Sequence, residues 1–135
     1  MSEQTQEKYM LLFRGNEWQK NLSPEDMQKI AGQWMAWFNR LTGEGTALAG
    51  SPLEREGKVV SARNGKVVDG PFVESKETIG GYFLLRVKNL DEAVAIAREC
   101  PGVPYGAVVE VRAVAEECPL IERAQAEPRS AAATA

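Results

Sequence analysis

The 135-residue sequence predicts one α+β domain of ferredoxin-like architecture, with two helices on one face of an antiparallel sheet. Three observations support this fold class. Short apolar runs alternate with two amphipathic segments, Asn64-Gly65 marks a hairpin between the halves, and each half has the order strand, helix, strand. A chain of about this length builds one core without needing disulfides.

The first half opens with a predicted strand over Tyr9–Phe13, a continuous apolar run typical of burial on both faces. A helix then begins after Ser23, a good N-cap residue that precedes a proline at the first helical position, and it ends near Thr42-Gly43. Apolar residues recur along this helix at positions 27, 30, 31, 34, 37, 38 and 41. Because the stripe includes Trp34 and Trp37, we expect it to anchor the core.

The middle of the chain is rich in strand formers. Ala47–Leu53 comes first, and Val59–Arg63 and Lys66–Asp69 then flank Asn64-Gly65. Asn-Gly between two such runs is a strong hairpin signal, since a type I′ turn needs two residues with positive φ. A further buried strand is predicted at Gly81–Val87.

The second half continues with a helix that begins at a capping box, Asn89 to Glu92, and stops at Pro101-Gly102. The last strand is expected at Val108–Val114, where Glu110 and Arg112 alternate with valines. We expect residues 1–7 to be a disordered lead-in, residues 8–115 to form the domain, and residues 116–135 to be a mobile tail with at most a helical turn or two.

The predicted strands are apolar on both sides, although both helices cover the same face of the sheet. A second copy of the chain would cover the other face, so the sequence predicts a homodimer. In the sheet order that we expect, the first and last strands are not neighbours.

Composition excludes several classes of function. The net charge of −3 argues against direct binding of nucleic acid. The chain has no histidine, and Cys100 and Cys118 lack partners at metal-ligand spacing, so we expect no metal site and two reduced thiols. No phosphate-binding glycine motif is present, and no cofactor is predicted. The polar N-terminus and short apolar runs predict a cytoplasmic protein that does not span a membrane.

Six segments in order resemble the YCII-related family, in its DGPF subgroup. The resemblance covers about residues 8–114, and the block that starts at Asp69 is its most specific part. The segments are Tyr9-Met-Leu-Leu-Phe-Arg-Gly, Leu22-Ser-Pro-Glu, Asp69-Gly-Pro-Phe-Val-Glu-Ser-Lys-Glu, Gly80-Gly-Tyr-Phe, Leu90-Asp-Glu-Ala and Val109-Glu-Val-Arg. The resemblance implies ferredoxin-like subunits that pair into a dimeric α/β barrel.

The resemblance implies less about function, because most members have no assigned activity. Some relatives have a His–Asp pair proposed to be catalytic, with the histidine near the start of the first helix. Met27 and Gln28 stand in that region here, and neither side chain can act as a base. Members of the subgroup are often labelled as transcription-initiation proteins, and some accompany extracytoplasmic sigma factors.

Asp69 is the candidate catalytic residue, and Glu74 and Lys76 are candidate binding residues close to it in sequence. A carboxylate in a partly buried cleft acquires a pKa suited to proton transfer, and a nearby lysine holds an anionic substrate. The alternative is structural, because Asp-Gly-Pro is also typical turn chemistry.

Arg14, Tyr82 and Arg112 are further candidates for ligand binding. Arginine clamps carboxylates and phosphates, although Arg112 could instead form an ion pair with Glu110. Tyr82 offers a phenol group or packs in the core. Trp18 either covers a pocket or caps the dimer seam.

Two functions from different classes remain. The first is a homodimeric small-molecule-binding protein, or a cofactor-free enzyme, with a cleft around the segment Asp69-Gly70-Pro71-Phe72. The second is a non-catalytic regulatory protein that binds a protein partner in transcription. A concave pocket with polar groups favours the first, whereas a filled cleft with an exposed apolar patch favours the second.

Overall fold

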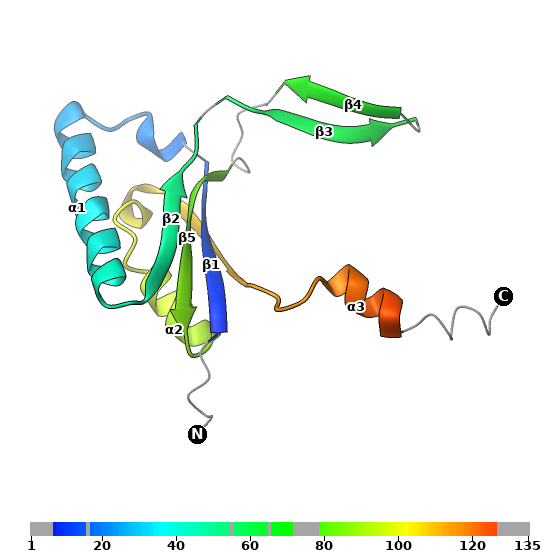
Figure 1. Ribbon diagram of the computed structural model, residues 1–135. Coiled ribbons are helices and arrows are strands. Elements are labelled where there is room, and N and C mark those ends of the chain that lie inside the picture. Colours follow the sequence, from blue (N-terminus) through cyan, green and yellow to red (C-terminus); the bar gives the residue numbers. More distant parts are fainter. Residues whose placement is uncertain (1–6, 16, 55, 65, 72–78, 127–135) are drawn as a thin grey trace.

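The computed structural model describes residues 7–15, 17–54, 56–64, 66–71 and 79–126 (Figure 1). Four strands form one antiparallel sheet in the order β2-β5-β1-β6. Helices α1 and α2 lie on the same face of this sheet (Figure 1), which confirms the ferredoxin-like fold class. The elements are β1 (Glu7–Arg14), α1 (Pro24–Gly43), β2 (Ala47–Pro52), β5 (Ile79–Val87), α2 (Leu90–Ala97) and β6 (Val108–Ala113).

The first and last strands are neighbours, and the expectation that they are not was wrong. β1 pairs with β6 along its length, with Leu11 opposite Val111 and Arg14 opposite Val108. Each helical connection skips one position in the sheet, so β5 lies between β1 and β2, and β1 lies between β5 and β6. β1 is therefore an interior strand with partners on both sides.

The β-rich middle forms a separate hairpin of β3 (Lys58–Arg63) and β4 (Lys66–Pro71), as predicted. Arg63 pairs with Lys66, which leaves a two-residue loop, and Asn64 has a φ of 54°. A positive φ at this position is what the Asn-Gly signal predicts. The hairpin stands beyond one end of the four-stranded sheet (Figure 1).

Residues of β1 alternate between the two faces of the sheet. Tyr9, Leu11 and Phe13 are buried under the helices, whereas Met10 and Leu12 are half-buried on the face without helices. Leu11 and its neighbour Leu85 on β5 are completely buried and lie at the centre of the core. Period-two alternation thus gives each strand one internal face and one uncovered face.

Local signals at the starts of both helices act as predicted. The Ser23 hydroxyl accepts a hydrogen bond from the Asp26 N–H at 3.1 Å, and the Asn89 side chain accepts one from the Glu92 N–H at 2.9 Å. Each bond satisfies a backbone donor that the helix itself leaves unpaired.

Two side chains of α1 contact Glu99, which lies just after α2. Its carboxylate accepts a hydrogen bond from the indole N–H of Trp37 at 3.0 Å and forms an ion pair with Arg40. This contact joins α1 to the end of α2 at the edge of the core.

Two short 3-10 helices and one terminal helix complete the described chain. They are η2 (Glu17–Gln19), η3 (Val103–Tyr105) and α3 (Pro119–Ala126). α3 has no buried residue and stands away from the sheet and its two helices (Figure 1). It lies in the segment for which the sequence predicts a helical turn or two. Within the described ranges, no helix is long and apolar enough to cross a membrane.

Candidate functional site

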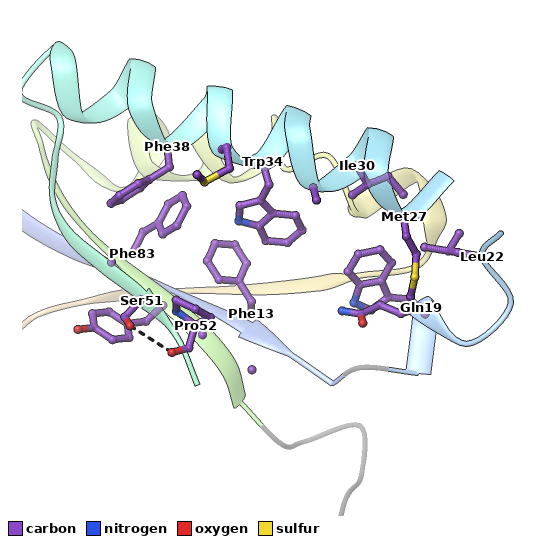
Figure 2. Close-up of a pocket in the computed structure, with 17 residues that line it drawn as sticks. Phe13, Gln19, Leu22, Met27, Ile30, Trp34, Phe38, Ser51, Pro52 and Phe83 are labelled. Carbon is purple, nitrogen blue, oxygen red and sulfur yellow. Dashed lines mark hydrogen bonds between the residues drawn. The ribbon is translucent and has the colours of Figure 1, made fainter. Parts of the chain in front are cut away.

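A cavity of about 620 Å³ lies between α1 and the sheet, next to η2, the end of β2 and the start of β5 (Figure 2). Residues from five elements line it, and most of them are apolar. Its aromatic lining residues are Phe13, Trp18, Trp34, Phe38, Tyr82 and Phe83.

The floor of the cavity is rigid and its rim is open to solvent. Phe13 and Phe83 form the floor; their rings meet edge to face with centroids 4.9 Å apart, and they are 9% and 6% exposed. Met27 and Met35 of α1 form the rim and are 44% and 64% exposed. Met27 lies on the apolar stripe expected to anchor the core. Its exposure shows that the first turns of α1 line a cavity instead of closing the core.

One wall is built by Trp18 and Trp34. Their rings stack with centroids 6.1 Å apart and an interplanar angle of 17°. Gly102 allows this position, because a Cβ at residue 102 would lie only 2.9 Å from the Trp18 ring. Trp18 therefore lines a pocket, which is one of the two roles that its sequence position suggested.

Polar groups in the cavity are few and neutral. Gln19 of η2 and Ser51 of β2 line opposite ends of it (Figure 2), and the Ser51 hydroxyl donates a hydrogen bond to the Pro52 carbonyl at 3.1 Å. Among the described lining residues there is no Asp, Glu, Lys or Arg. The described residues therefore offer the cavity mainly apolar and aromatic contacts.

The predicted site residues are divided between different parts of the molecule. Tyr82 is among the residues that line the cavity, although its side chain lies on the sheet face without helices, where it is paired with Leu12. Arg14 and Arg112 lie together on the sheet face without helices, where Glu110 pairs with both, at 3.5 Å and 3.2 Å respectively. Both arginines thus form ion pairs with Glu110. An ion pair is the alternative to ligand binding that the sequence left open for such an arginine.

The other three candidates are not brought into this cavity by the described structure. Asp69 lies in β4 of the hairpin, opposite Val60. Glu74 and Lys76 lie outside the described residues. The cleft expected around Asp69-Gly70-Pro71-Phe72 stays a prediction.

The described residues offer little covalent or metal chemistry. They include no cluster of three or more His, Cys, Asp and Glu side chains that could hold a metal ion. Cys100 is 1% exposed, and its burial raises the pKa of its thiol, which keeps the group neutral and unreactive. Cys118 is exposed.

Sequence reasoning missed this cavity because it assigned the aromatic stripe of α1 to packing. One signal was available: small residues, Gly50 on β2 and Gly80-Gly81 on β5, lie opposite large aromatic side chains. A Cβ at residue 50 would lie 2.8 Å from both Phe38 and Phe83, so the glycine leaves room for the two rings. The sequence alone does not reveal that small and large residues face each other in this way. The relation appears only once the positions of the strands relative to α1 are known.

Comparison with known proteins identifies the family. A curated protein of Rhizobium meliloti described as uncharacterised is 42% identical over 50 residues, which span 36% of this chain and only 40% of that protein. A solved structure of 5-chloro-2-hydroxyhydroquinone dehydrochlorinase from Burkholderia phenoliruptrix, in complex with 2,5-dihydroxybenzoquinone, is similar with a TM-score of 0.42 and 15% identity, over 81% of this chain and 95% of that one. The family model for the YCII-related domain matches residues 8–117, and the chain belongs to this family.

Proposed function

We propose that this protein binds a small molecule in the cavity between α1 and the sheet, and that it does so as a cytoplasmic homodimer. The cavity is the observation that supports the proposal. Its volume of about 620 Å³ lies within the range of about 300–1,000 Å³ that is typical of ligand sites. Such sites are mainly apolar with a few polar groups, as here.

The cavity also favours binding over the regulatory alternative. A protein that acts only by docking to a partner needs no internal space, and a filled cleft would have supported that function. Here Phe13, Trp34 and Phe83 line open space between α1 and the sheet. Retaining such a space costs stability, and ligand binding is the ordinary reason for it.

The sheet face without helices supports the proposed homodimer. Met10, Leu12, Tyr82 and Leu84 form an apolar patch there, beside the charged cluster of Arg14, Glu110 and Arg112. A face that contains both signs of charge beside apolar side chains is complementary to itself under two-fold symmetry. A second copy placed on this face leaves the cavity, on the opposite side of the sheet, open to ligand.

A thermal-shift screen of a metabolite panel tests the proposal, with two matched variants beside the wild type. Ala31→Phe adds a ring to the cavity lining, whereas Ala36→Phe adds the same ring to an exposed position of α1 outside the lining. A ligand at about a hundred times its Kd adds roughly 2.7 kcal/mol, which shifts the midpoint by several degrees.

We expect at least one compound to raise the midpoint of the wild type and of Ala36→Phe but not of Ala31→Phe. A compound that raises all three midpoints equally binds elsewhere and contradicts the assignment of the cavity. A panel without any hit counts against small-molecule binding itself.

A further inference from the structure

We infer that the cavity selects uncharged planar ring compounds and rejects the carboxylates of the same rings. The inference rests on the proposed function and concerns its ligand class. Two independent features of the described lining support it: the absence of ionised side chains and the arrangement of the aromatic rings.

The charge of the lining sets the first condition. The described lining offers a ligand the amide of Gln19 and backbone groups, because the side chains of Ser51 and Tyr82 lie on the sheet face without helices. A carboxylate that enters such a site loses its hydration and gains no positive partner from these described residues, which is strongly unfavourable. The two arginines that the sequence suggested as clamps already pair with Glu110 on the other face of the sheet.

The rings of the lining set the second condition. Trp34 extends from α1 toward Phe13, with centroids 5.1 Å apart and planes at 68° (Figure 2), and Trp18 stacks on Trp34. A ligand in this cavity thus meets both ring edges and ring faces. Flat aromatic molecules match edges and faces together, whereas a saturated ring of equal size makes only dispersion contacts.

A neutral polar group, the amide of Gln19, sets a weaker third condition. Gln19 both donates and accepts hydrogen bonds. A hydroxyl or carbonyl substituent on the ring satisfies such a group without introducing charge. The ligand class is therefore a neutral aromatic compound with oxygen substituents.

Three probes of similar size separate these conditions: 2-naphthol, 2-naphthoate and decahydro-2-naphthol. Their affinities for the full chain are measured by calorimetry and by quenching of tryptophan fluorescence near pH 7. We expect 2-naphthol to bind about tenfold or more tightly than either of the others, which is a readily measured difference. Ala31→Phe should abolish this binding and Ala36→Phe should retain it.

Trp18→Leu tests the ring arrangement, because it removes one flat wall and leaves the site apolar. We expect the preference for 2-naphthol over its saturated analogue to fall, while Tyr105→Leu, an exposed ring in η3 outside the lining, leaves it unchanged. If the preference is the same in Trp18→Leu and wild type, selection by this wall is wrong.

The failure of the inference is distinguishable from the failure of the proposed function. If 2-naphthoate binds as tightly as 2-naphthol and Ala31→Phe blocks both, the cavity is a binding site but its ligand class is not neutral. If none of the three probes binds, the ligand class is wrong, and the metabolite panel alone then decides whether the cavity binds a small molecule.

Discussion

The two faces of the four-stranded sheet have similar apolar residues but different environments. Leu11 and Leu12 are adjacent on β1; Leu11 is completely buried under the helices, whereas Leu12 is half-buried on the face without them. The first face obtains its cover from α1 and α2 of the same chain. In the described structure the second face has no such cover, and in the proposed homodimer a second copy supplies it. Apolar side chains on the two faces should therefore contribute different amounts to the free energy of unfolding.

Substitution of these adjacent leucines should produce the largest contrast. Leu11→Ala removes a fully packed side chain and should lower the free energy of unfolding by about 2–5 kcal/mol. Leu12→Ala removes a half-exposed one, and at concentrations where the chain is monomeric it should cost at most about 1 kcal/mol. Urea denaturation followed by circular dichroism measures both values.

Repeating the denaturation at high protein concentration sharpens the same contrast. The cost of Leu12→Ala should rise with concentration, because the proposed dimer buries this face, and the cost of Leu11→Ala should stay constant. Equal costs for the two variants at every concentration would show that the two faces do not differ as the fold indicates.

A charge on the uncovered face should have the next largest effect. Leu12→Asp places a carboxylate opposite Glu110 and should raise the dimer dissociation constant at least tenfold, or about 1.4 kcal/mol. Gln33→Asp, on the exposed side of α1, is the control and should leave association unchanged. Sedimentation velocity gives both constants. An unaffected dimer in Leu12→Asp would mean that the copies associate through another surface.

The smallest effect is expected within the helical layer on the covered face. Glu99→Ala leaves the Trp37 indole and Arg40 without their shared acceptor and should lower the free energy of unfolding by about 1 kcal/mol. Glu44→Ala removes an exposed carboxylate that contacts only Arg40, at 3.4 Å, and should cost less than about 0.5 kcal/mol. Thermal denaturation compares the two. Equal small losses would show that the link through Trp37 contributes nothing.

Elements encoded by neighbouring residues were predicted well from the sequence. Ser23, Asn89 and the pair Asn64-Gly65 act through backbone groups two to four positions away, so their effect is visible in a short stretch of letters. The order of strands and helices, and with it the ferredoxin-like class, followed from these local signals.

Features that depend on distant residues were not predicted. The pairing of β1 with β6 and the cavity beside Trp18 both join segments that lie far apart in the sequence. Trp34 illustrates the difficulty, because its spacing on α1 is the same whether its ring fills a core or lines a cavity. Of the candidate site residues whose side chains the structure describes, Tyr82 is among the residues that line the cavity, whereas Arg14 and Arg112 lie on the other face of the sheet. The two arginines were chosen for chemical type and not for a position that sequence could establish.

The interior position of β1 also affects how the chain is made. β1 ends at Arg14, yet its two partners begin at Ile79 and Val108, so it leaves the ribosome long before either of them. At about 5–20 residues per second, synthesis of the roughly 100 intervening residues takes on the order of 5–20 s. Until β5 is synthesised this apolar strand has both edges unpaired, and until β6 follows it has one, which is a hazard for association with other nascent chains. α1 is the first long helix after β1 and forms early from its own local signals. It can therefore cover one apolar face of β1 during synthesis.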